Sequence, residues 1–370
     1  ITSMTCTFDI AVIGGGIMGC GAALQLAGGG MNTVILEQGD IGGGASGVNA
    51  GTLSMQIKRV KLMPYAIKGH AEWERMGSSV GFKKTGGYTL AFNDREAELL
   101  NERMNMKREA GANITFIEPS KLENIEPHLT KKIVAASYCP DDGFANSSLT
   151  GQYYRNRIEE AGIHFFERYK VTGIRSTSEG YEINSGSETI SARRILLACG
   201  GWMKTIAAML GADLPIRARV NTVSVTERAP KFMNSVIGHA TGLLTMKQKD
   251  NGTLLIGGGW QGKGKPEDGR GNVSIDSLIP NLQLAQFVVP ELSKIRIIRS
   301  WTGFESNVPD FYPLAGKLPN NDNVFILGCV RGGYTIGPYI SKLVGDYILD
   351  KELELPLFDP SRKMEEGKLI

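Results

Sequence analysis

The sequence lacks the features that mark membrane, disulfide-rich and metal-binding proteins. No uninterrupted apolar stretch reaches the ~18 residues of a membrane-spanning helix, so we expect no membrane span. The five cysteines are scattered, odd in number and without a C-x-x-C pair, which argues against a disulfide framework, a zinc site and an iron–sulfur cluster. This usage favours a reducing, cytoplasmic location. The four histidines show no ligand spacing, so no metal is expected.

The sequence also lacks a basic run and internal repeats. With a net charge of +3 and no interleaving of basic and aromatic residues, it gives no sign of nucleic-acid binding. Its 370 residues suggest two domains. Glycine is abundant instead, at 47 of 370 residues against a usual ~7%. The glycines form short clusters, which favours contact between backbone and ligand over low complexity.

The first cluster lies between an apolar strand, 8–13, and a helical stretch, 17–27. Gly14 to Gly19 satisfies G-x-G-x-x-G, and a second apolar strand ends on Glu37. In this context Gly14 makes the tight turn, Gly16 lets a pyrophosphate approach the backbone and Gly19 lets the helix pack on the strand. Glu37, about 20 residues further, is placed to bind a ribose diol. The sequence therefore predicts a dinucleotide site at the N-terminus, and the apolar segment there is not a signal peptide.

Three later segments extend this pattern. A loop of small residues spans 42–51, a buried strand at 194–199 ends in Gly200-Gly201-Trp202, and a glycine loop at 328–338 opens the last helix. Between them we expect helices at 63–76, 94–110, 147–161 and 275–289. We expect strands at 87–92, 114–117, 134–138, 164–166, 170–175, 181–184, 189–192, 223–226, 242–246, 253–258, 295–301 and 324–327.

Taken in order, these segments resemble the D-amino-acid-oxidase superfamily of FAD-dependent oxidoreductases over essentially the whole chain. The sequence of Gly47–Leu53 is most similar to that of the catalytic β subunits of opine oxidases and dehydrogenases. Glycine oxidase and sarcosine oxidase β are the other similar members. The resemblance implies an α/β (α+β) fold in which a Rossmann-like FAD domain carries an inserted antiparallel β-sheet domain. The FAD domain would comprise 1–81, 143–211 and 300–370, and the substrate domain 82–142 and 212–299.

The resemblance also implies which residues bind non-covalent FAD. The pyrophosphate, ribose, flavin and adenine would contact residues from all three glycine segments and the strands between them: Gly14, Gly16, Ile17, Met18, Gly19, Glu37, Gln38, Ala45, Ser46, Ala50, Gly51, Thr52, Val171, Gly200, Trp202, Gly303, Arg331, Gly332, Gly333, Tyr334, Thr335 and Ile336. No cysteine stands near Gly303 for a covalent link, and Cys329 is expected to be a buried filler. Some members carry FMN at a subunit interface, so the resemblance allows a second flavin.

Arg331, Glu305 and Thr52 are the candidate catalytic residues. A forked cation suits an amino-acid carboxylate, and Arg331 aligns with a carboxylate-binding arginine of glycine oxidase. The alternative is an arginine that pairs only with flavin or a structural acid. Family members often carry a second arginine where this chain has Glu305. We hypothesise that Glu305 faces a cationic part of an opine; the alternative is an ion pair with Arg299 or with another subunit.

The implied activity is oxidation of a secondary-amine amino acid to an imine, by hydride transfer to flavin N5 and then imine hydrolysis. The chain would be the catalytic subunit of a hetero-oligomer for opine catabolism, with an α partner and a γ partner carrying an iron–sulfur centre. D-hydroxyproline, proline, sarcosine and glycine are alternative substrates. A non-catalytic flavin-binding subunit is another reading. An NAD-linked reductase is weaker, because the chain has no second G-x-G-x-x-G.

Overall fold

The computed structural model describes residues 7–367, so Cys6 and the outermost residues of the predicted FAD domain lie outside it. The chain divides into two compact units. Unit 1 comprises the N-terminal segment up to Val48, Ser147–Arg219 and the segment from Phe304 onward, and unit 2 comprises Asn49–Asn146 and Val220–Gly303. Strands β13 (Arg217–Thr226) and β17 (Ile297–Asn307) each pass from one unit into the other.

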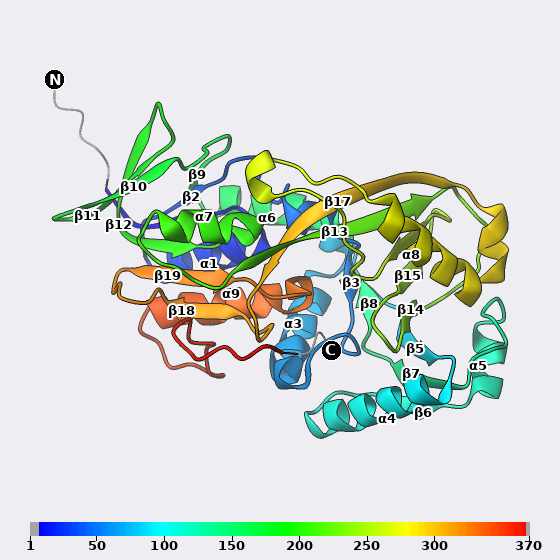
Figure 1. Ribbon diagram of the computed structural model, residues 1–370. Coiled ribbons are helices and arrows are strands. Elements are labelled where there is room, and N and C mark those ends of the chain that lie inside the picture. Colours follow the sequence, from blue (N-terminus) through cyan, green and yellow to red (C-terminus); the bar gives the residue numbers. More distant parts are fainter. Residues whose placement is uncertain (1–6, 368–370) are drawn as a thin grey trace. The chain divides into compact units, whose positions relative to one another are not determined.

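Unit 1 is built on a mixed sheet with helices packed on it (Figure 1). The path of this sheet is β10-β11-β12-β1-β2-β9, and β19 joins β12 and β18. Its strands are β1 (Phe8–Ile13), β2 (Thr33–Leu36), β9 (His164–Phe166), β10 (Gly173–Thr177), β11 (Gly180–Asn184), β12 (Thr189–Leu197), β18 (Leu314–Lys317) and β19 (Val324–Gly328). Its helices are α1 (Ile17–Gly28), α2 (Ala45–Val48), α6 (Ser147–Glu160), α7 (Met203–Ala208) and α9 (Gly333–Ile348).

The centre of this sheet is parallel and buried. β1 pairs in parallel with β2 and β12, and β12 pairs in parallel with β19. A parallel sheet covered by helices has continuous apolar strands, which explains the run Phe8–Ile13. Ile195, Leu197 and Ile326 contribute fully buried side chains to the same core. The carboxyl ends of these strands consequently meet at one edge, where open α/β sheets bind ligands.

Small residues let the first and last helices of unit 1 pack closely. Helix α1 lies beside α9, far away in the sequence, as the blue and orange ribbons of Figure 1 show. A Cβ on Gly21 would lie 2.2 Å from the Ser341 hydroxyl oxygen, so the two helices approach at glycine. The Gln25 side-chain amide also donates to Asp346 at 2.7 Å. The end of the chain thereby supports the N-terminal helix.

Unit 2 contains a second large sheet and a small one. The large sheet runs β17-β13-β16-β15-β14-β5-β7-β6, and the small one runs β3-β8-β4. Their further strands are β3 (Thr52–Leu53), β4 (Lys83–Lys84), β5 (Gly87–Ala91), β6 (Thr115–Ile117), β7 (Ala135–Cys139), β8 (Gly143–Phe144), β14 (Val236–His239), β15 (Thr245–Gln248) and β16 (Leu254–Gly257). The helices of this unit are α3 (Met63–Met76), α4 (Asp94–Glu109), α5 (Pro119–Ile125) and α8 (Ile275–Val288).

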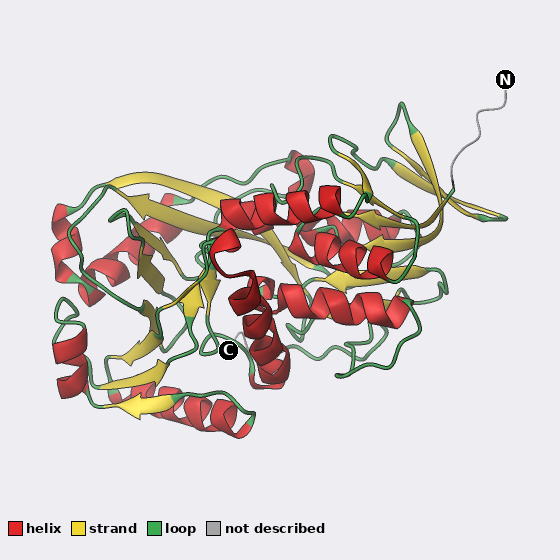
Figure 2. Cartoon of the chain, turned by 180° about the vertical axis from the view of Figure 1, so that it is seen from behind, coloured by secondary structure: helices red, strands yellow, loops and turns green. Residues whose placement is uncertain are grey.

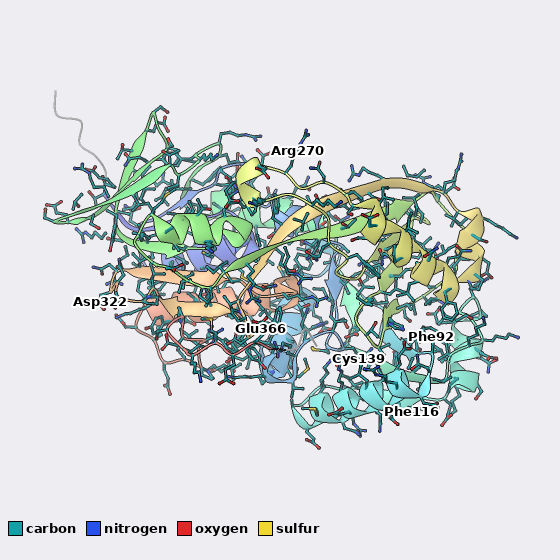
Figure 3. The ribbon with its side chains drawn as sticks, viewed as in Figure 1. Phe92, Phe116, Cys139, Arg270, Asp322 and Glu366 are labelled. Atoms are coloured by element: carbon teal, nitrogen blue, oxygen red, sulfur yellow. The ribbon has the colours of Figure 1, made fainter. Side chains whose placement is uncertain are left out.

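The large sheet of unit 2 is mainly antiparallel, with one exception to the prediction. β14 pairs with β5 in parallel, and the long connection between these two strands allows that direction. Helix α4 packs against β5 and β7. It is labelled in Figure 1 and is one of the red helices of Figure 2. Cys139, labelled in Figure 3, is a fully buried residue at the end of β7.

A buried carboxylate joins two loops of unit 2. Asp142 is 1% exposed, and it accepts hydrogen bonds from the Ser54 hydroxyl at 2.5 Å and the Met55 backbone N–H at 2.7 Å. Burial raises the pKa of Asp142, and the hydrogen bond from Ser54 opposes that rise. Because residues 49–81 pair and pack with this part of the chain, they belong to unit 2, whereas the sequence assigned them to the FAD domain.

Several expected elements differ in detail. The small-residue loop 42–51 contains a short helix, α2, and the strand expected at 170–175 starts only at Gly173. The strands expected at 189–192 and 194–199 form one strand, β12. Residues 217–222 extend β13, and β14 was missed. Within residues 7–367, no helix is both long and apolar enough to cross a membrane.

Candidate functional site

The turn after β1 admits only glycine at two positions. Gly14 has a φ of +112°, and a Cβ on it would lie 2.3 Å from the carbonyl oxygen of Ala198 at the end of β12. A Cβ on Gly19 would lie 1.9 Å from the carbonyl oxygen of Gly14. Both distances are well below van der Waals contact, so any side chain would push α1 and β12 away from the turn. These glycines have the packing roles that the motif predicts.

The start of α1 has the geometry of an anion site. Gly16 is the N-cap, and within 4 Å of a Cβ on it the described structure has only the Ser46 hydroxyl oxygen, at 3.1 Å. The Ile17 N–H donates to that oxygen at 3.1 Å, which brings two predicted FAD-binding residues together. Met18 and Gly19 follow in the first turn, where backbone N–H groups have no partner within the helix. The positive helix end and the room above Gly16 suit a pyrophosphate.

Glu37 lies beside this turn, at the end of β2. Its carboxylate accepts hydrogen bonds from the backbone N–H groups of Gly15 and Gly39, each at 2.7 Å. Burial raises the pKa of Glu37, while these two hydrogen bonds oppose the rise. A carboxylate has about four acceptor positions, so two N–H donors leave room for hydroxyl donors of a ribose. Gln38 next to it is exposed.

Two further predicted segments lie in unit 1. The Tyr169 N–H donates to the Glu37 carbonyl at 2.9 Å, and buried Val171 follows Tyr169 by two residues in the chain. Gly200 and Trp202 form a 3₁₀ turn after β12. The Ser306 hydroxyl donates to the Gly200 carbonyl at 2.8 Å and holds this turn against β17.

The third glycine loop joins β19 to α9 through strained backbone. Cys329 and Gly332 have φ angles of +57° and +67°, a region that a residue other than glycine seldom adopts. The Glu305 carboxylate accepts a hydrogen bond from the Gly332 N–H at 2.7 Å and thereby fixes the loop next to Arg331. Gly333, Tyr334, Thr335 and Ile336 form the first turn of α9, where the Tyr334 hydroxyl lies 2.8 Å from that of Thr150.

Arg331 lies in a charged environment. Burial lowers the pKa of Arg331, the positive charge of Arg219 lowers it further, and Glu305 opposes both effects. The structure therefore brings the predicted residues Arg331 and Glu305 together, and it adds Arg219. The predicted alternative partner of Glu305, Arg299, instead lies over the ring of Trp301, 4.6 Å from its centre.

Thr52 lies in unit 2 and contacts a buried lysine. The Lys247 ammonium, on β15, donates to the Thr52 hydroxyl at 2.6 Å, and Lys247 is 1% exposed. Burial lowers the pKa of Lys247 to about 7, and the charge of Lys249 contributes. A lysine poised between its two protonation states can hold or release a proton at Thr52 near neutral pH.

The other candidates in unit 2 are Gly51, Ala50 and Gly303. Gly51 has a φ of +73°, and a Cβ on it would lie 2.0 Å from the carbonyl oxygen of Ala145. Ala50 is half-buried before it, and Gly303 lies within β17. Their contacts with FAD stay predictions.

Sequence reasoning missed three residues: Arg219, Lys247 and Ser306. Lys247 and Thr52 are 195 residues apart, and nothing in the local pattern of β15 indicates a buried cation. Arg219 alternates with Arg217 in a strand, a pattern that is typical of a solvated face.

We predict that Gly16→Ala folds normally but binds FAD more weakly. The new methyl group meets only the Ser46 hydroxyl, so it disturbs little in the chain and instead occupies the room proposed for the pyrophosphate. Flavin content after purification and an FAD titration of stripped protein measure the effect, expected at about 10-fold or more, or ~1.4 kcal/mol. The control is Gly28→Ala, at the other end of α1, where a Cβ meets nothing within 4 Å. Equal affinity in both variants would contradict the assignment.

We also predict that Lys247 makes stability depend on pH. Its pKa of about 7 when folded lies below the ~10.4 of an unfolded lysine, so between these values only the unfolded chain binds the proton. The free energy of unfolding should therefore rise with pH from about 7 to about 10, by at most ~1.4 kcal/mol per pH unit from this group. Denaturant unfolding at several pH values measures the slope. Lys247→Met should reduce it, and substitution of the exposed Lys231 by Met should not.

Comparison with known proteins agrees with this geometry. The profile of the DAO family, described as FAD dependent oxidoreductase, matches residues 9–347. The chain is 27% identical to glycine oxidase of Geobacillus kaustophilus, over 99% of both chains. It is 26% identical to an opine oxidase subunit of Rhizobium meliloti, over 94% of both. The crystal structure of L-proline dehydrogenase from P. horikoshii shares the fold, with a TM-score of 0.87 at 23% identity, over 96% of this chain and 97% of that one.

These matches confirm the predicted fold class, the predicted family and the predicted class of enzyme. Three parts of unit 1 fit FAD, the cofactor of that class: the glycine turn, the helix N-terminus with Ser46 and the Glu37 carboxylate. The chain belongs to the DAO family of FAD-dependent oxidoreductases.

Proposed function

We propose that this chain is the catalytic subunit of an enzyme that oxidises the secondary amine of an opine-like amino acid. The observation that carries the proposal is the position of Arg331, which precedes the first turn of α9 with Glu305 fixed beside it. Arg331 would hold the substrate carboxylate, because a guanidinium fork matches a carboxylate in two hydrogen bonds. Similarity to the opine oxidase subunit and to the β subunit of sarcosine oxidase supports the choice of a secondary amine.

Bound FAD would supply the acceptor for the hydride, at flavin N5, and the imine product would then hydrolyse. The residues of the chain would act mainly by positioning the amine and by excluding water, since this chemistry needs few acid–base groups. Thr52, with Lys247 behind it, is the candidate group for holding a proton. Burial raises the pKa of the Cys329 thiol to about 12, so it would be a poor nucleophile, which supports non-covalent FAD.

Three relatives, two opine oxidase subunits B and one sarcosine oxidase subunit beta, are named as subunits, which supports a hetero-oligomer. The proposal includes an α partner and a γ partner with an iron–sulfur centre. It also includes FMN at a subunit interface and a cytoplasmic location. Glycine oxidase among the relatives favours a second candidate, oxidation of a smaller amine such as glycine or sarcosine.

Anaerobic addition of amines to the purified complex tests the function. We expect octopine or nopaline to bleach the yellow flavin absorbance faster than sarcosine, glycine, proline or D-hydroxyproline, because the proposed site selects an opine. Reduction by dithionite is the control for a flavin that can accept electrons. If dithionite bleaches the flavin and no amine does, the chain is a non-catalytic flavin-binding subunit.

Glu305→Arg tests the proposed preference for a cationic substrate arm. The reversal of charge should lower kcat/KM for octopine relative to sarcosine by about 10-fold, or ~1.4 kcal/mol. Glu305→Gln is the matched control, since its amide oxygen can still accept the Gly332 N–H while the charge is gone. Both variants should lose preference for octopine over sarcosine, and Glu305→Arg should lose more of it than Glu305→Gln. An unchanged ratio between cationic and neutral substrates would rule out this role.

A further inference from the structure

Arg219 has a buried donor for which the described part of the chain provides no acceptor. It lies on β13, next to β17, which carries Glu305. Its side chain is half-buried, and its Nε has no hydrogen-bond partner within residues 7–367. The guanidinium of arginine is a donor only, so this N–H must either remain unsatisfied, which is unfavourable, or bind an acceptor from outside.

Arg217 on the same strand shows the contrast. It donates two hydrogen bonds to the carboxylate of Glu366, at 2.7 and 3.0 Å, and more than half of its side chain is exposed. Glu366 is labelled in Figure 3. The chain thus provides Arg217 with a carboxylate of its own.

Arg219 lies on the strand next to β17, and Glu305 on β17 is hydrogen-bonded to the loop that carries Arg331. The charge of Arg219 lowers the pKa of Arg331, and the carboxylate of Glu305 opposes this effect. That carboxylate is held at the Gly332 N–H, so it is part of the loop geometry. We call Arg219, Arg331 and Glu305 the paired-arginine cluster. With two guanidinium groups and one carboxylate, it carries an excess positive charge that an anionic ligand would neutralise.

We infer that Arg219 binds the second carboxylate of the opine-like substrate, on the other carbon next to the amine nitrogen. This inference rests on the proposed function and adds a specificity-determining residue to its site. A guanidinium fork takes one carboxylate in two parallel hydrogen bonds, so two forks match two carboxylates. Arg331 binds one of them, Arg219 binds the other, and the amine nitrogen lies between.

Inert thioethers test this assignment apart from turnover. Thiodiacetate has two carboxylates and (methylthio)acetate has one, and sulfur replaces the amine in both. Each is titrated into the FAD-loaded protein, and the change in flavin absorbance gives its Kd. Arg219→Gln should weaken thiodiacetate binding by about 100-fold and (methylthio)acetate binding by less than ~3-fold, because loss of one partner of a desolvated charge pair weakens binding by that order. Arg219→Lys should restore part of the loss, since it keeps the charge without the fork.

Arg217→Gln is the matched control and should change neither Kd. Flavin content and thermal unfolding show whether each variant is folded. Equal weakening of both thioethers by Arg219→Gln, or no change in either, would overturn the inference. Selective loss of thiodiacetate binding supports it even if no amine bleaches the flavin, an outcome that would reject only the proposed function. If octopine bleaches the flavin but Arg219→Gln does not selectively weaken thiodiacetate binding, only the role of Arg219 is rejected.

Discussion

The contact between the Gly14 turn and the end of β12 is the constraint on which unit 1 depends. Gly14 approaches Ala198 so closely that a single methyl group would separate them, and its N–H donates to the Leu36 carbonyl at 2.9 Å. This fixes three neighbouring parallel strands at their carboxyl ends. Helix α1 can then start at Gly16 with its free N–H groups directed at the same edge.

The proposed nucleotide-binding features and the proposed substrate-selecting features depend on different physical interactions. The features around β1 and α1 are made by backbone, since glycine positions and helix N–H groups determine what can approach. The features around Arg331 are made by charged side chains on β13, β17 and the loop before α9. Glu305 belongs to both sets of features. Its carboxylate accepts the Gly332 backbone N–H, and its negative charge raises the pKa of Arg331. Substrate preference in such a fold can therefore change while cofactor binding is kept.

Much of the fold could be predicted from local patterns. Helix α3 and strand β9 have the predicted bounds, because a long helical stretch before Gly77 and a short aromatic run after Gly162 carry clear signals. The two-residue strands β3, β4 and β8 carry no such signal, since they exist only through pairing with one another. Residues 49–81 were predicted to belong to the FAD domain, whereas they lie in unit 2 of the structure, because contacts between distant segments, such as Ser54 with Asp142, decide the compact units.

The sequence by itself predicted the glycine turn after β1 and the family, and it made Arg331 and Glu305 candidate site residues, because these predictions depend on residue type at fixed local spacing. Only the tertiary structure brought Lys247 to Thr52 and Arg219 to Arg331. The chemical role of a buried charged side chain depends on the groups around it, and these groups lie on strands from separate parts of the chain. The local sequence of β13 or β15 does not predict which strands will lie next to it in the sheet.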